Sequence, residues 1–287
     1  MNITIAGAFT HNIIDSLIKL KKHLKVTVYD GPNNCPWNGG RINRNIQIDI
    51  KDIEKYNKLD IRVALTFSNP NIDLTNEVGL SLLRDMHHSQ LLHGVRNEII
   101  LINEDFREYL RLNWEFILKF SITGHDLEAY PDEVLQKEYI KYYKDLEWKY
   151  DIIVPKMEHI FQEWFYKNVS VSKYEIMLND TCRPNCQYYK QHFEEIARLN
   201  TIFQDQESAY EYNNVLAKSV EECWLPNFDP NNELTSCKTG MDLDQELLNK
   251  ARKIGYGSFK ISGRENEKED MINEIFKVTR MGISKSL

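Results

Sequence analysis

Five cysteines are the side chains of this sequence best suited to chemistry. Cys182 and Cys186 are separated by three residues, in a predicted loop between a strand and a helix. Thiolates at that spacing can reach one metal ion or cluster. Cys35 follows an earlier predicted strand. Cys223 and Cys237 belong to a long insertion that can fold over the end of the fold where the other three cysteines lie. The sequence therefore predicts a [4Fe–4S] cluster or a four-thiolate zinc site; the alternative is that these thiols are ordinary buried side chains.

Polar side chains beside other predicted strand ends are candidates for catalysis and substrate binding. Asn179, Asp180 and His192 flank the cysteine pair and are the predicted catalytic residues. Arginines 41 and 264 follow glycine-containing turns, where a guanidinium can bind a carboxylate or phosphate with two hydrogen bonds. A structural salt bridge is the alternative role for both. The predicted substrate-binding residues, for a small acidic molecule, are Arg41, Asn69, Asn103, His125 and Arg264.

Two other functions stay open on the residues alone. A divalent metal held by nitrogen and oxygen ligands would support hydrolysis or isomerisation. Its candidate ligands are His125, Glu158, His159 and Asp180. Alternatively, the chain is a non-catalytic binding module whose insertion forms the partner surface. Aromatic and apolar side chains of the type that anchors interfaces occur there, namely Trp224, Pro226 and Phe228.

Short β-branched or apolar runs alternate with longer amphipathic segments along the whole chain. Eight runs predict strands, at residues 3–6, 25–29, 63–67, 98–102, 116–122, 151–154, 174–178 and 258–261. Most are nearly continuous in apolar character, which is typical of strands covered on both faces of a parallel sheet. Helices are expected at 12–22, 76–92, 104–112, 131–148 and 159–167, and Asp49, Thr75 and Asn103 are the expected caps.

This alternation predicts an α/β fold, a (β/α)8 TIM-type barrel. An open doubly wound sheet is the alternative, although no Gly-x-Gly-x-x-Gly follows the first strand, which disfavours its dinucleotide-binding form. Barrel active sites lie at the C-terminal ends of the strands, where the candidate residues fall. We expect a single barrel domain over residues 1–287, in which residues 200–255 form an insertion or lid before the last strand.

The composition agrees with a folded intracellular protein. The 287 residues are 42% hydrophobic and 28% charged, with a net charge of −7. The acidic balance disfavours a nucleic-acid partner, since such binding needs a basic surface. No apolar run of about 18 residues predicts a membrane helix, and the N-terminus lacks a signal-peptide pattern. We therefore expect a cytoplasmic location, no membrane contact and reduced cysteines.

Three motifs resemble those of a known superfamily. Residues 255–264, GYGSFKISGR, resemble the "G-x-x-S-[LF]-K-I-E-G-R" segment of the collagenase-like peptidases of the unknown-mechanism class. Residues 175–193 resemble the "E-I-L-V-N-E-x-C-x-x-x-C…H-Y" segment of uncharacterised relatives, some from phages and surface-polysaccharide loci. Residues 28–41 resemble the "V-Y-G…G-G-R" of the same relatives. The superfamily also holds iron–sulfur, prephenate-dependent RNA hydroxylases and paired ubiquinone-biosynthesis accessory proteins.

The resemblance implies a TIM-type barrel, hydroxylation or related redox chemistry, and a partner subunit like that of the paired relatives. In the ubiquinone-type members, cluster ligands follow the second and seventh strands. The matching positions here are Cys35, Cys182 and Cys186, with Cys223 or Cys237 as the fourth ligand. Ser262 replaces the glutamate of the family motif, and a cysteine-rich block is not recognisable. Peptidase activity is therefore not expected.

Overall fold

The computed structural model of the protein describes residues 1–32, 35–39, 48–122, 125, 127–179, 189–202, 245–262, 268–269, 271–273 and 275–276. All eight predicted strands are present, and their ends lie within one residue of the predicted ones. The strands are β1 (Asn2–Ala6), β2 (Lys25–Asp30), β3 (Arg62–Phe67), β4 (Glu98–Leu101), β5 (Ile117–Ser121), β6 (Ile152–Val154), β7 (Glu175–Met177) and β8 (Ser258–Ile261).

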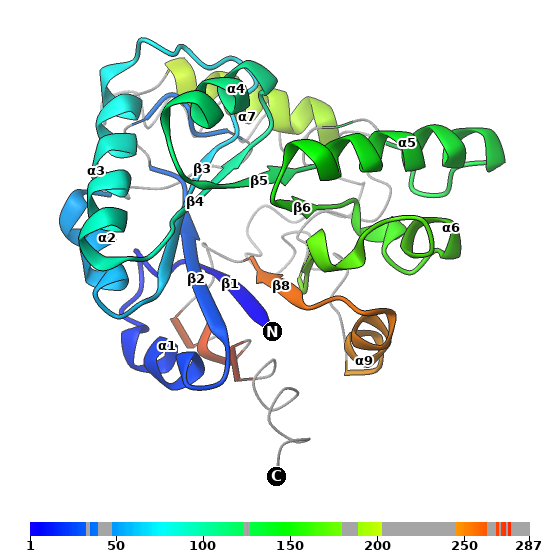
Figure 1. Cartoon of the computed structure of the whole chain (residues 1–287), viewed down its shortest axis with the longest axis horizontal. Coiled ribbons are helices and arrows are strands. Elements are labelled where there is room, and N and C mark those ends of the chain that lie inside the picture. Colours follow the sequence, from blue (N-terminus) through cyan, green and yellow to red (C-terminus); the bar gives the residue numbers. More distant parts are fainter. Residues whose placement is uncertain are drawn as a thin grey trace, which may run out of the picture.

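The strands form one eight-stranded parallel sheet that curls into a barrel (Figure 1). Their order in the sheet is β6-β5-β4-β3-β2-β1-β8-β7, so each strand lies beside its neighbour in the sequence and β8 lies beside β1. The edge strands β6 and β7 meet through a parallel bridge between Ile153 and Tyr174, outside any regular ladder. The predicted (β/α)8 TIM-type barrel is confirmed as a nearly closed barrel, and the open doubly wound sheet is wrong.

Helices follow the strands, as the apolar periodicity predicts. They are α1 (Ile14–Lys21), α2 (Ile50–Asn57), α3 (Glu77–His93), α4 (Glu104–Asn113), α5 (Glu133–Lys149), α6 (Glu163–Tyr166), α7 (Tyr189–Ile202) and α9 (Gln245–Ile254), with 3-10 turns η1 (Met157–His159) and η2 (Val171–Lys173). No helix of the described residues combines the length and apolar character needed to cross a bilayer.

Two of the three expected helix caps are confirmed. The Asp49 carboxylate accepts hydrogen bonds from the backbone of α2, and Asn103 caps α4 in the same way. At α3 the cap is Asn76, one residue later than expected. The hydroxyl of Thr75 instead donates to the carboxylate of Asp73, 2.7 Å away. Thr75 therefore belongs to the turn before the helix.

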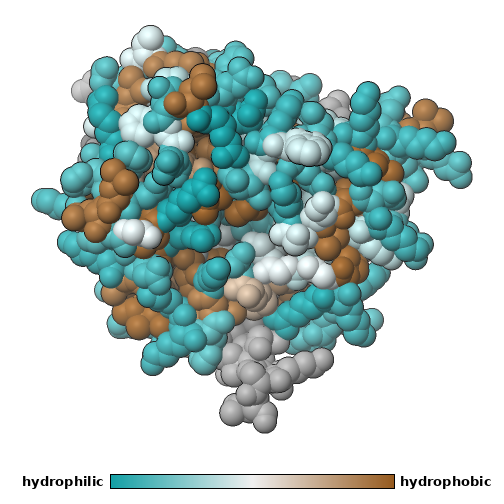
Figure 2. Space-filling model, viewed as in Figure 1, coloured by the Kyte–Doolittle hydropathy of each residue, from teal (hydrophilic) through white to brown (hydrophobic). Residues whose placement is uncertain are grey.

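The strands are buried on both faces, and the two faces differ in chemistry. Outward-facing residues such as Ile3, Val28, Leu65 and Phe259 are apolar and belong to the main core. The outer surface drawn in Figure 2 is mostly hydrophilic, with scattered apolar groups. Bulky branched side chains usually fill the interior of such barrels. Here the interior is largely polar, and it contains buried ions.

Helix α7 departs from the regular barrel pattern. It follows β7, yet its C-terminal part forms hydrogen bonds with Asn38 and Asn69. These two residues follow β2 and β3, on the opposite side of the barrel. In the view of Figure 1 it lies in the upper part of the molecule, away from α9 and β8. Its 14 residues span about 21 Å. We infer that α7 lies across part of the C-terminal face of the barrel.

Helix α9 occupies the usual place of the helix before β8. It carries the buried side chains Leu248 and Ala251, and it ends four residues before β8 begins. Residues 245–254 belong to the 200–255 segment that the sequence predicts as an insertion or lid. Residues 203–244 lie outside the described part of the chain.

Candidate functional site

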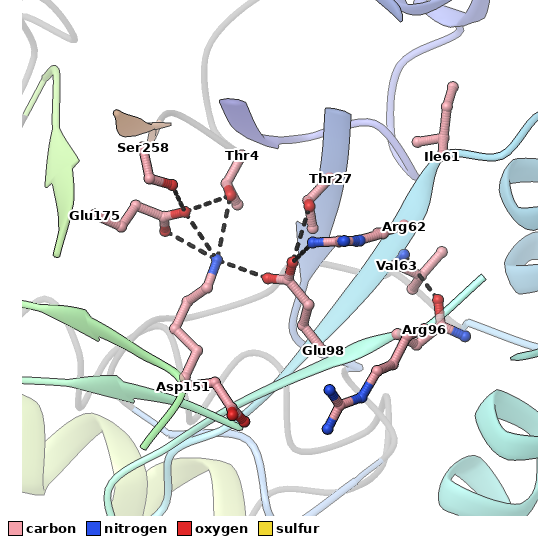
Figure 3. A network of polar contacts seen from close by, with 12 residues as sticks. Thr4, Thr27, Ile61, Arg62, Val63, Arg96, Glu98, Asp151, Glu175 and Ser258 are labelled. Carbon is pink, nitrogen blue, oxygen red and sulfur yellow. Dashed lines mark hydrogen bonds and ion pairs between the residues drawn. The ribbon is translucent and has the colours of Figure 1, made fainter. Parts of the chain in front are cut away.

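The N-terminal half of the barrel interior contains a buried network of ions (Figure 3). The Lys119 ammonium on β5 lies 2.7 Å from the Glu98 carboxylate and 2.9 Å from that of Glu175. All three side chains are at most 2% exposed. Strands β4, β5 and β7, which are not all neighbours in the sheet, are thus tied across the interior.

Four further side chains complete this ion network. The hydroxyl of Thr4 donates to Glu175 at 2.6 Å, and the hydroxyl of Thr27 donates to Glu98 at 3.0 Å. Arg62 lies 3.5 Å from Glu98 at the exposed end of the network. Ser258 also donates to Glu175. We define the ion network as Thr4, Thr27, Arg62, Glu98, Lys119, Glu175 and Ser258, in which two cations face two carboxylates.

Glu98 and Lys119 of the network favour their ionised forms. Burial alone would raise the pKa of Glu98, but the ammonium of Lys119, the guanidinium of Arg62 and the Thr27 hydroxyl together lower it. Burial would likewise lower the pKa of Lys119, and the two carboxylates raise it. A balanced set of this kind at the N-terminal end of a barrel is suited to stability rather than to chemistry.

The C-terminal half of the interior has different residues. Tyr29 of β2 lies between Ala6 of β1 and Ala64 of β3, its direct partners in the sheet. These three side chains and Ile100 form a small buried cluster. The ammonium of Lys260, from β8, lies 4.2 Å from the centre of the Tyr29 ring. We call Ala6, Tyr29, Ala64, Ile100 and Lys260 the Tyr29 layer.

A buried hydroxyl lies next to this layer. Thr66 follows Ala64 on the inward face of β3 and is 5% exposed. Among the described residues, its Oγ1 atom has no hydrogen-bond partner. Leaving such a group without a partner costs free energy, so it marks a place where a ligand's acceptor or donor would be stabilised.

Asn69, a predicted substrate-binding residue, connects α7 to the barrel. Its Nδ2 group donates to the carbonyl oxygens of Pro36 at 2.8 Å and Ala197 at 3.1 Å, and to the Thr201 hydroxyl at 2.9 Å. Two of these acceptors belong to α7. The side chain of Asn69 therefore holds the helix against the C-terminal face, and a substrate contact there stays a prediction.

Asn179, a predicted catalytic residue, joins the ends of β7 and β8. Its Oδ1 atom accepts from the backbone N–H of Ser262 at 2.7 Å, and its Nδ2 group donates to the Ser262 carbonyl at 2.9 Å. The Ser262 hydroxyl donates to the Asn179 carbonyl. The amide thus extends the pairing of the two strands at the C-terminal face. Its catalytic role stays a prediction.

Asn103 and His125 also follow strands, as predicted. Asn103 caps α4 and donates to the Pro70 carbonyl at 2.8 Å, so both ends of its amide have backbone partners. His125 bonds through Nδ1 to the Tyr142 hydroxyl at 3.2 Å. Burial lowers the pKa of His125, and Lys190 adds to the effect. The imidazole is therefore mostly neutral near pH 7.

Cys35 is the cysteine that the structure describes. It lies five residues beyond β2 and is 1% exposed. Burial raises the pKa of its thiol to about 12, against the effect of a hydrogen bond from the Trp37 backbone. The indole of Trp37 donates to the Asp73 carbonyl at 2.8 Å and packs directly on Gly79 of α3. These contacts hold the segment that carries Cys35 against the barrel.

His159 is less available for chemistry than its position suggests. One ring nitrogen bonds to the Tyr143 hydroxyl at 2.9 Å and the other to the Glu128 carbonyl at 2.7 Å. Burial lowers the pKa of His159 to about 4. Both nitrogens of the neutral imidazole thus have partners within the chain, and its role as a metal ligand stays a prediction.

Several predicted site residues lie outside the described part of the chain: Arg41, Asp180, Cys182, Cys186, Cys223, Cys237 and Arg264. His192 lies in α7, and its side chain is not described. Within the described ranges, no three His, Cys, Asp or Glu side chains form a group that could hold a metal ion. The predicted cluster and metal ligands therefore stay predictions.

The buried ions and Thr66 are not among the predicted site residues, because those residues come from the loops that follow the strands and the ions lie within the strands. A signal was present inside the strands. Glu98, Lys119, Glu175 and Lys260 are charged residues within short, otherwise buried strands. A charge in such a strand must have a partner, because burying an isolated ion is costly.

Comparison with known proteins adds little. No family model matches the chain, and no curated protein matches it. Among solved structures, that of the U32 peptidase Mk0906 is similar, with a TM-score of 0.46 over 91% of this chain and 92% of that chain. The two chains are 9% identical. A similarity at this level carries no conclusion about function.

Proposed function

We propose that this chain is a barrel enzyme whose reaction centre lies at the C-terminal face, beside α7. The observation that carries the proposal is the difference between the two halves of the interior. The ions of the N-terminal half are held in a balanced network. The C-terminal half buries the Lys260 ammonium over the Tyr29 ring, and it also contains the buried Thr66 hydroxyl. Barrel enzymes place their reacting groups at this end.

We further propose that the cysteines at this face hold a [4Fe–4S] cluster. Its ligands would be Cys35, Cys182, Cys186 and either Cys223 or Cys237. Two observations on Cys35 support the assignment: it lies beyond a strand end, and its sulfur accepts a backbone hydrogen bond, a contact that stabilises ligating thiolates. When bound, the cluster would supply electron-transfer chemistry for hydroxylation or a related redox step.

The high thiol pKa of Cys35 has a consequence for this proposal. Without metal the thiol is protonated at neutral pH, since burial raises its pKa to about 12. Binding must therefore release a proton, and it should weaken as the pH falls. An acidic small molecule stays the proposed substrate class, and the buried ammonium of Lys260 in the barrel interior supports it.

The test is anaerobic purification followed by analysis of iron and acid-labile sulfide. We expect about four irons per chain and the visible absorbance of a cluster. Cys35→Ser and Cys182→Ser should each lower the iron content. Of Cys223→Ser and Cys237→Ser, one should lower it and the other should serve as the matched control.

Protein that lacks iron and sulfide after anaerobic reconstitution would overturn the cluster proposal. Bound zinc or manganese in place of iron would instead indicate hydrolysis or isomerisation. A metal-free chain that captures a partner tightly and transforms no substrate would indicate the binding module.

A further inference from the structure

We propose that the C-terminal ends of α3, α4 and α5 form a dimer interface, where a second copy of this chain docks. Four exposed apolar side chains define this surface, which we call the Trp148 surface: Leu91, Leu92, Leu112 and Trp148. Helices of a (β/α)8 barrel run opposite to its strands, so the surface lies at the N-terminal end of the barrel. The inference is independent of the proposed function, whose site lies at the other end.

The exposure of these side chains is the first observation. Trp148 is 91% exposed, Leu112 85%, Leu91 67% and Leu92 59%. Trp148 and Leu112 each come two residues after a buried leucine of the same helix, which is a rotation of about 200° around the helix axis. They therefore point away from the core, on the side of a helix where charged and polar residues are usual.

Contacts between α3 and α4 bring two of these leucines to the same place. The ring of His87 packs against the ring of Trp114, just beyond the last turn of α4, with the ring centroids 5.3 Å apart. Leu91 lies four residues after His87 and so shares its face of α3. Leu112 lies two residues before Trp114. Leu91 and Leu112 are therefore neighbours across the two helix ends.

Contacts between α4 and α5 place Trp148 on the other side of Leu112. The guanidinium of Arg111 donates to the carbonyl of Lys149 at 3.4 Å. Arg111 precedes Leu112 in the chain, and Lys149 follows Trp148. The apolar side chains thus continue over the ends of three successive helices. Exposed apolar side chains that gather in this way are typical of an interaction surface, whereas isolated ones are ordinary.

The charges around the Trp148 surface favour a second copy of the chain as the partner. Arg111 pairs with Asp151 at 3.0 Å, and Lys149 pairs with Asp145 at 2.9 Å. Two cations and two carboxylates thus lie side by side, although the whole chain has a net charge of −7. Across a two-fold axis, each cation can face a carboxylate of the second copy. Nucleic acid or an anionic membrane would need an excess of cations, which these pairs do not supply.

The area of the surface is also sufficient for a dimer. Four side chains of this size and exposure offer about 500 Å² of apolar surface. A standard interface buries about 800 Å² on each partner, with an apolar centre and a polar rim. The apolar side chains would form the centre and the ion pairs the rim. Trp148 is then the expected anchor, since tryptophan is enriched among the residues that dominate binding.

The test is sedimentation velocity of the full chain, without cluster reconstitution, at concentrations from about 1 to 100 μM. We expect the chain to pass from monomer to dimer. Trp148→Ala should weaken dimerisation at least about thirtyfold, because both copies lose the anchor, and Leu112→Ser about fivefold to tenfold. Trp148→Phe should retain most of the affinity. Tyr130→Ala is the matched control, since it removes a 71% exposed ring before the start of α5, at the other end of the barrel.

Two further measurements keep the result specific to this surface. The urea midpoint of each variant, measured at a concentration where the wild type is monomeric, should equal that of the wild type, because the side chains are exposed. The emission of Trp148, obtained as the difference between wild type and Trp148→Phe, should shift to shorter wavelength as the concentration rises.

A chain that stays monomeric over the whole range overturns the inference. A dimer that is unaffected by both Trp148→Ala and Leu112→Ser also overturns it, since another face would then form the interface. Assemblies larger than a dimer would contradict the two-fold arrangement. None of these results depends on iron, so the cluster proposal is tested separately.

Discussion

The two halves of one barrel interior bury lysines in opposite ways. Lys119 in the N-terminal half faces two carboxylates at less than 3 Å. Lys260 in the C-terminal half lies over an aromatic ring at 4.2 Å. The Glu98 and Glu175 carboxylates neutralise the Lys119 ammonium, and these ion pairs hold β4, β5 and β7 together. The arrangement of Lys260 instead places the charge against an aromatic ring and so links β8 to β2 past the intervening strand β1.

The largest expected effect is on the ion network. Lys119→Met removes the shared cation and leaves Glu98 and Glu175 buried together without it. We expect a loss of about 3–5 kcal/mol in the free energy of unfolding, measured by urea denaturation. Adding Glu98→Gln and Glu175→Gln to that variant should recover part of the loss, since the uncompensated charges are then gone. Lys25→Met is the exposed control and should change stability by less than about 0.5 kcal/mol. A similar stability for Lys119→Met and Lys25→Met would show that the network is dispensable.

We expect the ion network in the N-terminal half of the barrel to make the free energy of unfolding depend on pH. The pKa of Glu98 is lower in the folded chain than in the unfolded chain, because Lys119 and Arg62 outweigh its burial. Its contribution is therefore complete above the unfolded pKa, near 4.5, and is lost as the pH falls through the folded pKa. Urea unfolding between neutral and acidic pH measures this. Glu98→Gln should show a shallower acid dependence than the wild type, and an unchanged dependence would contradict the assignment.

A smaller and local effect is expected where Asn69 holds α7. Asn69→Ala leaves the carbonyl of Ala197 and the Thr201 hydroxyl without this donor. We expect about 1–2 kcal/mol less protection for the amides of α7 in hydrogen exchange, and little change elsewhere. Asn113→Ala, at the exposed end of α4, is the matched control. A uniform loss of protection over the barrel would show that Asn69 supports the whole fold instead.

The smallest expected effect on stability is that of Lys260. Lys260→Met removes a buried ammonium that contacts the Tyr29 ring, so the lost attraction and the avoided desolvation offset each other in part. We expect a change within about 1 kcal/mol in the free energy of unfolding, measured by urea denaturation. A loss as large as that of Lys119→Met would erase the distinction between the two halves.

The fold was predictable because each strand has a recognisable local pattern in the sequence. Runs such as 63–67 are short, mostly apolar and bounded by polar segments, which is how strands of a covered parallel sheet appear. The cap at Asp49 is equally local, since its partners are the next few residues. The displaced cap at α3 shows the limit, because Thr75 and Asn76 are both good caps and a contact with Asp73 decides between them.

The candidate site was less predictable because its contacts are long-range. Placing Asn69 and Asn179 at strand ends follows from the sequence, but partners such as the Ala197 and Ser262 carbonyls are 128 and 83 residues away. The charge of Lys260 is visible in the sequence, whereas its place over Tyr29 depends on the order of β8, β1 and β2. Spacing within a chain does not specify which interior residues meet across a closed barrel.

The crossing of α7 has a consequence for how the chain folds. The hydrogen bond from Asn69 to Ala197 joins residues 128 positions apart, and it requires β2, β3 and β7 to be in place first. Contacts of such sequence separation form late, because the entropy of closing the loop is lost before the contact compensates for it. We therefore expect α7 to dock only after β2, β3 and β7 have joined the sheet. The part of the C-terminal face that α7 crosses would then remain accessible until these strands are in place.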